Sequence, residues 1–217
     1  LKAVKEYLLH RIGTEKRACW YLQQFLKMGY ALQCQNPYYL VWDGDTLPHR
    51  KLTFFSEEKA LFSYSEEYHI PYFETMERLI GLNKSFEKSF IAEHMMFDRK
   101  IMAELIERIQ SKNANQPWFF NILDAIDNKD LTDSGFSEFE TYGTYMFQNY
   151  KDRYTPRYIW HNRMDSNKFL FIFLKRRVSK IFDTSSFENW QSVSVKIHLQ
   201  NCRRAKRRKE AFKEIEW

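Results

Sequence analysis

The sequence predicts an α/β fold, in which a mixed sheet is flanked by helices and followed by a basic C-terminal tail. Segments with apolar residues at helical spacing alternate along the chain with short, continuous apolar runs that are bounded by turn residues. Hydrophobic residues make up 44% of the 217 residues and aromatic residues 18%, which is enough apolar surface to fold around a core. These observations exclude a chain that is disordered throughout.

The expected elements follow one another as helices and short strands. Periodic apolar positions predict helices, and continuous apolar runs predict strands. The expected helices cover residues 14–28, 72–82, 98–110, 117–125 and 137–150. The expected strands cover residues 38–42, 52–55, 60–64, 90–97 and 157–161.

Local signals set the bounds of the elements in the first half of the chain. A helical pattern starts with the first residues, and the apolar residues of 14–28 recur at helical spacing up to Gly29, a residue type that commonly ends helices. The run 38–42 has turn residues on both sides, so it predicts a strand buried on both faces of the sheet. A polar turn at 56–59 separates the next two strands.

Capping signals set the bounds in the second half. Asp98 can cap the helix that follows it, whose apolar stripe should lie in the core. Pro117 suits the first turn of the next helix. Ser137 and Glu140 have the spacing of a capping box, which predicts a helix start. The run 157–161 reads as a final strand.

The chain is expected to consist of a catalytic domain, residues 1–165, and a basic C-terminal extension, residues 166–217. Because a helix opens the sequence without an initiating strand, we expect the natural protein to extend further at its amino end. We find no internal repeat and no low-complexity segment.

Basic residues concentrate near the C-terminus. The net charge is +6, and the run from Arg203 to Lys209 is almost entirely Lys and Arg. Such density is expected to seek phosphate groups. Peripheral contact of residues 196–213 with an anionic membrane is the alternative we favour, ahead of a simple solvated helix, and we expect no nucleic acid partner.

Cysteine use and hydropathy predict a cytoplasmic protein, with peripheral association at the inner membrane face. The three cysteines are odd in number and far apart, which argues against a disulfide framework. No apolar run approaches the roughly 20 residues that span a bilayer.

Asp43 and Asp45 flank Gly44 at the end of the predicted strand 38–42. Paired carboxylates at a strand end can present oxygen ligands to Mg²⁺ or Mn²⁺, and such ions bridge to a substrate diphosphate. Taken alone, the Asp-x-Asp pattern is weak, because Asp-Gly is also a common turn dipeptide.

Four sequence blocks, found in order between about Gly13 and Arg163, resemble bacterial GT-A glycosyltransferases of polysaccharide and lipopolysaccharide biosynthesis. The blocks are Trp20-Tyr21-Leu22-Gln23-Gln24, Tyr39-Leu40-Val41-Trp42-Asp43-Gly44-Asp45, Phe90-Ile91-Ala92-Glu93-His94-Met95-Met96-Phe97 and Phe136-Ser137-Glu138-Phe139-Glu140-Thr141-Tyr142-Gly143. The first strand and base-binding loop of that family are not present in this sequence.

The resemblance implies a metal-dependent hexosyl transfer from a nucleotide-sugar donor, most simply a UDP-sugar, to a saccharide or lipid-linked saccharide. It implies that Asp45 ligates the metal, and that Asp43 contacts the ribose, or the metal through water. Arg17 and Gln24 would line the donor side. His161 would be a further metal ligand, or alternatively a histidine satisfied by backbone hydrogen bonds.

Glu138 and Glu140 are the candidates for the base that an inverting transfer requires, because a carboxylate must take the proton of the attacking hydroxyl. Glu140 could instead close the capping box, and Glu138 could simply favour the helix dipole. If the reaction retains configuration, the leaving phosphate can serve as the base and neither residue need be catalytic.

Glu93, His94 and Tyr142 are candidates for acceptor binding. Glu93 and His94 interrupt an apolar run, where a polar side chain needs either a partner or a substrate. A buried structural hydrogen bond is the competing explanation. Tyr142 could stack on a sugar ring, although aromatic residues more often pack in cores.

Two other functions compete with glycosyl transfer. A nucleotidyltransferase acting on sugar phosphates would also use a metal, but it should carry a glycine-rich phosphate loop that is not seen in this sequence. A non-enzymatic, basic nucleic-acid-binding module would bind through the C-terminal tail, with an affinity that falls steeply with salt.

Overall fold

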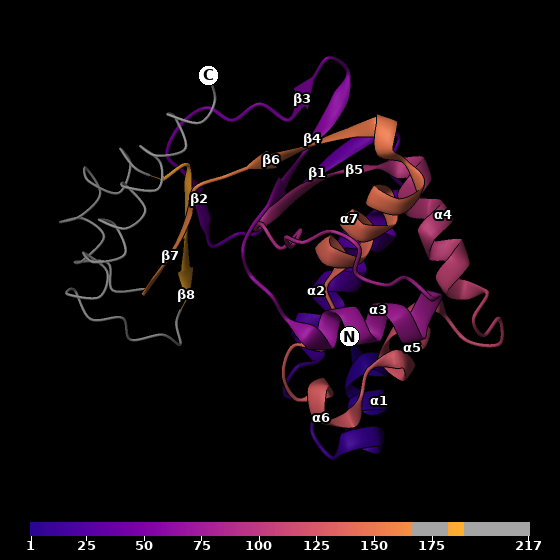
Figure 1. Cartoon of the computed structure of the whole chain (residues 1–217). Helices are drawn as coiled ribbons and strands as arrows, with labels where there is room; N and C mark the ends of the chain where they lie inside the picture. Colours follow the sequence, from indigo (N-terminus) through magenta and orange to yellow (C-terminus); the bar gives the residue numbers. More distant parts are fainter. Residues whose placement is uncertain (166–181, 189–217) are drawn as a thin grey trace. The chain divides into compact units, whose positions relative to one another are not determined.

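The computed structural model describes residues 1–165 and 182–188, and these residues form a mixed α/β fold (Figure 1). The chain divides into two compact units, one made of Leu1–Val41 and Phe54–Pro156 and the other of Trp42–Thr53 and Arg157–Trp217. Residues 42–53 thus belong with the C-terminal part, a division that differs from the expected boundary at 165. The basic segment 196–213 lies outside the described residues. No described helix is long and apolar enough to cross a bilayer.

The helices occur close to the predicted positions. They are α1 (Lys2–Ile12), α2 (Ala18–Gly29), η1 (Tyr30–Leu32), α3 (Ile70–Ile80), α4 (Arg99–Gln110), α5 (Trp118–Ala125), α6 (Asn128–Leu131), α7 (Glu138–Asn149) and η2 (Lys151–Arg153). The five apolar residues of the α4 stripe are all buried, as predicted. The short helix α6 was not predicted, because its four residues are too few to show a period.

Side-chain caps begin two helices at the predicted residues. The Asp98 carboxylate accepts hydrogen bonds from the backbone N–H groups of Lys100 (2.9 Å) and Ile101 (3.3 Å) at the start of α4. The Ser137 hydroxyl accepts one from the N–H of Glu140 (3.2 Å) at the start of α7. Both caps satisfy N–H groups that a helix start leaves without partners.

α2 ends at Gly29 as predicted, but Gly29 does not have the left-handed conformation of a C-cap glycine. The chain continues from Gly29 directly into η1, and Gly29 itself has a helical φ of −62°. A Cβ at Gly29 would make an ordinary contact of 3.5 Å with the Trp118 ring, so packing does not require glycine there. Left-handed C-cap glycines are found at Gly13, where φ is 73° at the end of α1, and at Gly81, where φ is 69° at the end of α3.

The strands form three small sheets among the described residues, and the single mixed sheet that we expected is not found there. The first sheet pairs β1 (Tyr38–Trp42) with β5 (His94–Asp98). The second has the order β3 (Phe55–Ser56), β4 (Lys59–Tyr64) and β6 (Tyr154–Tyr158). The third has the order β2 (Thr46–Pro48), β8 (Thr184–Glu188) and β7 (His161–Asp165), and it is mixed because β8 pairs antiparallel with β2 and parallel with β7.

Four strand predictions need correction. The predicted strand 52–55 is irregular up to residue 54, and β3 covers only Phe55–Ser56. β1 is not buried on both faces, because Tyr39 is 8% exposed and Leu40 is 41% exposed. β5 starts at His94 and not at 90, since the chain before it is irregular. The predicted strand 157–161 is in fact two strands, so that His161 begins β7 and does not end the strand before it.

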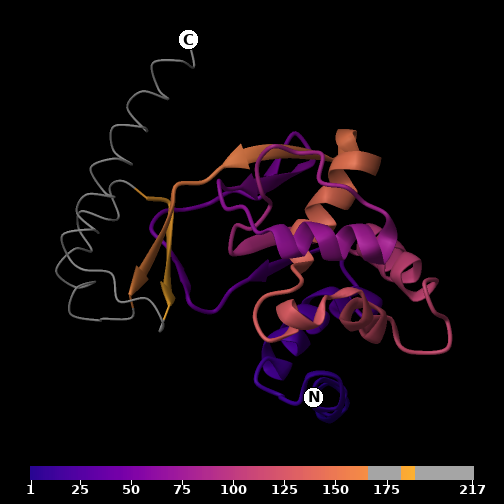
Figure 2. The ribbon, with the colours of Figure 1, turned by 60° about the horizontal axis from the view of Figure 1, so that its bottom comes forward.

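Helix α7 lies at the centre of the first unit. It packs against α2, α3 and α4, and Figures 1 and 2 show it among these helices. Its inner face includes Tyr142, which has no exposed surface, and Gly143. A Cβ on Gly143 would lie 2.3 Å from Phe90, so only glycine lets this aromatic ring rest on the helix.

Replacing Gly143 by alanine should therefore destabilise the first unit. The added methyl group must displace a fully buried Phe90 ring, and overpacking of this kind costs about 1–3 kcal/mol. Urea unfolding followed by circular dichroism measures the loss. Gly44→Ala is the control, because no atom lies within 4 Å of a Cβ at that position. An equal midpoint for Gly143→Ala and the wild type would contradict the packing argument.

Candidate functional site

The residues predicted from the sequence to form the site are divided between the two units. Asp43, Asp45 and His161 belong to the second unit. Arg17, Gln24, Glu93, His94, Glu138, Glu140 and Tyr142 belong to the first.

The segment from Asp43 to Asp45 forms a tight turn between β1 and β2. The N–H of Thr46 donates to the carbonyl of Asp43 (3.0 Å), and the indole N–H of Trp42 donates to the carbonyl of Thr46 (2.8 Å). Asp45 is exposed and Asp43 is partly buried. The backbone therefore fixes the turn while at least one carboxylate, that of Asp45, is open to solvent.

His161 is held by two hydroxyl groups of β8. Its Nδ1 lies 2.8 Å from the Thr184 hydroxyl and its Nε2 lies 3.0 Å from the Ser186 hydroxyl. The pairing of His161 with Thr184 across β7 and β8 places these side chains together. Of the two alternatives for His161, this geometry favours the histidine that is satisfied by hydrogen bonds, but the printed partners are side-chain hydroxyls and not the backbone groups that we expected.

The third sheet connects the strand after the Asp turn to the strand that carries His161. Thr46 in β2 pairs with Ser186 in β8, and His161 in β7 pairs with Thr184. The ligand atoms of Asp43, Asp45 and His161 nevertheless do not form a set within 4.8 Å of one another. A cation at this turn would therefore need ligands from its substrate, as is usual for Mg²⁺.

Glu138 forms a buried ion pair with Lys27. The Lys27 ammonium lies 2.7 Å from the Glu138 carboxylate, and the two side chains are 11% and 2% exposed. The ammonium also lies 4.6 Å from the centre of the Phe139 ring. The Gln24 side-chain amide faces the same carboxylate. Its nitrogen is the group that can donate a hydrogen bond to Glu138. This cluster joins α2 to α7, and both Gln24 and Glu138 were predicted from the sequence as site residues.

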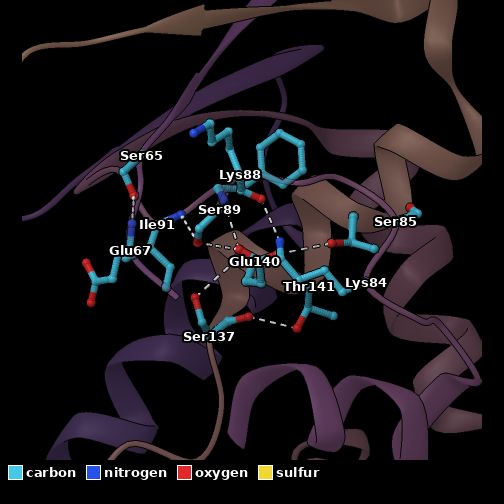
Figure 3. Close-up of polar contacts among 12 residues, drawn as sticks. Ser65, Glu67, Lys84, Ser85, Lys88, Ser89, Ile91, Ser137, Glu140 and Thr141 are labelled. Atoms are coloured by element: carbon cyan, nitrogen blue, oxygen red, sulfur yellow. Dashed lines mark hydrogen bonds and ion pairs between the residues drawn. The ribbon is translucent and has the colours of Figure 1, made fainter. Parts of the chain in front are cut away.

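Glu140 does not complete the capping box with its side chain. Its buried carboxylate accepts hydrogen bonds from the Ser89 hydroxyl (2.6 Å), the Phe90 N–H (2.8 Å) and the Thr144 hydroxyl (3.3 Å). The Lys84 ammonium adds an ion pair at 3.0 Å. Figure 3 shows these contacts converging on Glu140. A carboxylate so fully bonded, with no exposed surface, is better suited to a structural role than to proton transfer.

Arg17 links the start of α2 to the loop before α7. Its guanidinium donates to the carbonyl of Asp133 (2.6 Å) and to the hydroxyl of Ser134 (2.6 Å), and it lies 4.6 Å from the centre of the Trp20 ring. Arg17 therefore contacts the segment that leads into α7, and Gln24 contacts the first turn of α7. Donor binding by either residue stays a prediction.

Of the three acceptor candidates, Glu93 is partly exposed and the other two are buried. His94 is 2% exposed, and its Nε2 lies 3.1 Å from the Ser63 hydroxyl, which favours the structural hydrogen bond that we had considered. Tyr142 is fully buried, and its hydroxyl accepts a hydrogen bond from the Asp98 N–H (2.9 Å). Burial raises the pKa of Tyr142 well above its usual value. Tyr142 thus packs in the core and cannot stack on a sugar in this conformation.

A group of acidic residues that the sequence did not reveal lies between α3 and α6. The carboxylates of Glu74, Asp127 and Asp130 lie within 4.8 Å of one another, the one such set found in the part of the chain that the structure describes. Arg78 lies 3.9 Å from Glu74 and 3.3 Å from Asp127. This arginine already compensates part of the negative charge, so the group needs no cation to be stable.

The partners of the two buried glutamates were also missed in the sequence. Lys27 follows Gln24 by three residues, so helical spacing could have placed both on one face of α2. Lys84 and Ser89 lie in an irregular loop far from Glu140 in sequence, and no local pattern could have identified them.

A family profile matches residues 10–205, which include every predicted site residue. The chain belongs to DUF6492, a family of unknown function. A search among curated proteins found no match. Membership of DUF6492 therefore establishes the family without assigning a reaction.

Removing only the positive charge of the ion pair between Lys27 and Glu138 should strongly destabilise this DUF6492 protein. Lys27→Met leaves a buried carboxylate without its countercharge, which costs about 3–5 kcal/mol. Urea unfolding measures this loss. The double variant Lys27→Met, Glu138→Gln removes both charges and should recover most of it.

The matched control is the exposed pair of Lys2 and Glu6, whose side chains are 90% and 65% exposed. Lys2→Met should leave the unfolding midpoint unchanged. If Lys27→Met behaved like Lys2→Met, the buried pair would not support the junction of α2 and α7.

Proposed function

We propose that this DUF6492 protein is a metal-dependent glycosyltransferase that moves a sugar from a nucleotide sugar, most simply a UDP-sugar, to a saccharide or lipid-linked saccharide. The observation that carries the proposal is the Asp43-Gly44-Asp45 turn, which directly follows the strand β1 and keeps the Asp45 carboxylate exposed. The resemblance of four sequence blocks to GT-A glycosyltransferases supports the same reading.

The residues at the turn fit a hard divalent cation, Mn²⁺ or Mg²⁺. Carboxylate oxygens are the ligands that such ions prefer, and Asp45 and Asp43 supply them from one short turn. His161 fits less well, since a metal bond would require it to give up a hydroxyl contact to Thr184 or Ser186. When bound, the ion would supply charge stabilisation for a departing nucleoside diphosphate.

The residues of the chain itself perform the remaining tasks. The backbone hydrogen bond between Thr46 and Asp43 holds the turn, so the backbone that carries the two carboxylates needs little reordering when the donor binds. We do not assign the acceptor base to Glu138 or Glu140, because each carboxylate is buried and bonded to a lysine. A reaction in which the donor phosphate accepts the proton is compatible with this arrangement.

Asp45→Asn tests the proposal. Loss of one carboxylate ligand should abolish the stabilisation that a UDP-sugar with Mn²⁺ gives to the wild type, because only a ligand bound to the folded state raises Tm. Release of UDP from the same donor should fall on the order of 100-fold or more. Thermal unfolding with a panel of UDP-sugars, with and without Mn²⁺, measures the first effect.

The control is Asp152→Asn, which removes an exposed carboxylate from η2 in the first unit. This variant should respond to donor and Mn²⁺ like the wild type. A wild-type chain that no UDP-sugar stabilises in the presence of Mn²⁺, or full activity in metal-free buffer, would refute the proposed function.

A further inference from the structure

One face of the third sheet gathers hydroxyl groups from β2 and β8 around the imidazole of His161 in β7. Thr46 in β2 pairs with Ser186 in β8, and His161 pairs with Thr184 in β8. Side chains of directly paired residues project to the same face of a sheet, as do side chains two residues apart in one strand. Figure 1 shows the three strands next to one another. We call Thr46, Thr184, Ser186 and His161 the hydroxyl face.

The hydroxyl groups of this face are buried. Thr184 has no exposed surface, Ser186 is 1% exposed and Thr46 is 3% exposed. His161 is only partly buried, so the face reaches solvent at the imidazole. Burying a hydroxyl group costs free energy unless its proton finds an acceptor. The partners of these protons therefore show whether the face is complete by itself.

The hydroxyl group of Thr46 makes no hydrogen bond in the part of the chain that the structure describes. Its backbone, in contrast, is fixed on both sides. The Thr46 N–H donates to the carbonyl of Asp43 (3.0 Å), and the Thr46 carbonyl accepts from the indole N–H of Trp42 (2.8 Å). The hydroxyl group is therefore held in place, buried and unbonded.

At least one more hydroxyl proton on this face lacks an acceptor. Among residues 1–165 and 182–188, the hydroxyls of Thr184 and Ser186 bond only to the two ring nitrogens of His161. A neutral imidazole has one N–H donor and one acceptor nitrogen, so only one of these hydroxyls can donate to it. The other hydroxyl accepts, and its own proton is left over. A doubly protonated imidazole would leave both protons over.

The ligand that completes this face must therefore be rich in acceptors. A water molecule or a sugar hydroxyl would bring further protons to a face that already has too few acceptors. A metal cation fits poorly, because no member of the hydroxyl face is a carboxylate. The oxygens of a phosphate group accept several hydrogen bonds at once, and their charge strengthens each of them.

The acidic residue beside the face does not oppose an anion. Asp183 precedes Thr184, and its carboxylate forms an ion pair with Arg50 and accepts a hydrogen bond from the N–H of Trp160 (3.0 Å). Its negative charge is thus compensated within the same unit of the chain.

We propose that the hydroxyl face binds a phosphate group. Thr46 donates a hydrogen bond to one phosphate oxygen, and the hydroxyl that accepts from His161 donates another. The group belongs either to a nucleotide or to free phosphate, since both present the same oxygens. This site does not depend on the proposed glycosyl transfer, and it does not require Asp45 to touch the same ligand.

Thr46→Val tests the proposal, because valine has nearly the same shape as threonine and lacks the hydroxyl group. Without phosphate, the Tm of the full chain should be unchanged or higher, since the removed hydroxyl makes no bond. The Kd for inorganic phosphate, measured by isothermal titration calorimetry, should rise about 10-fold. Thr46→Ser keeps the hydroxyl group and should bind phosphate like the wild type.

The matched control is Ser185→Ala, in the same strand but on its opposite face. Ser185 has no exposed surface, and its hydroxyl lies 2.8 Å from Nε2 of His49. Removing this bonded hydroxyl should lower Tm and leave the Kd for phosphate unchanged. The two variants should thus show opposite patterns, which separates ligand binding from support of the fold.

A wild type that shows no saturable binding of inorganic phosphate would overturn the proposal. A wild-type Kd in Thr46→Val would also overturn it, as would a fall in its Tm like that of Ser185→Ala, because the hydroxyl would then already have a partner. Acetate that displaces phosphate at equal concentration would overturn the choice of phosphate as the ligand.

Titrations with UDP and with uridine, both without Mn²⁺, distinguish the two sources of the phosphate group. If the group belongs to a nucleotide, Thr46→Val should weaken the binding of UDP about 10-fold. If the ligand is free phosphate, the variant should bind UDP like the wild type. In both cases the binding of uridine should be unchanged, and a weakening equal to that of phosphate would overturn the proposal.

Failure of the proposed function would be recognised separately. A wild type that no UDP-sugar stabilises in the presence of Mn²⁺ would refute glycosyl transfer, whereas the phosphate titrations contain neither a UDP-sugar nor Mn²⁺.

Discussion

Two buried carboxylates in the first turn of α7 organise the first unit. Glu138 bonds to Lys27 of α2, and Glu140 bonds to Lys84 and to the loop that precedes β5. A helix N-terminus favours negative charge, which lowers the cost of placing two acids there. The remaining desolvation cost is offset only because each acid has a lysine and further donors. These bonds consequently fix α7 against α2 through Glu138 and against the loop before β5 through Glu140.

The parts of the fold that could be predicted from the sequence depend on neighbours in the chain. Ser137 and Asp98 cap helices through N–H groups two or three residues away, and a pattern of that length is visible in the sequence. Apart from Thr144, the partners of the Glu140 carboxylate lie about fifty residues earlier in the chain, so only the folded structure reveals them. The same carboxylate therefore resembled half of a capping box in the sequence.

The candidate site follows the same rule. The Asp43-Gly44-Asp45 turn was recognisable because its two acids and its glycine are consecutive, and the structure places them in a turn as expected. The surroundings of His161 were not recognisable, because its hydroxyl partners come from β8, in a segment with no clear strand pattern. Tyr142 was ambiguous for another reason, since its aromatic ring suits a core and a sugar equally well until its burial is known.

The hydrogen bond between the Phe90 N–H and Glu140 also bears on local dynamics. Amide protons of irregular loops usually exchange with solvent quickly, because small fluctuations expose them. This amide is bonded to a carboxylate that has no exposed surface, so deuterium can replace its proton only when the loop and α7 separate. A segment without regular secondary structure thereby acquires the slow exchange of a core strand, and its opening is coupled to that of the helix beneath it.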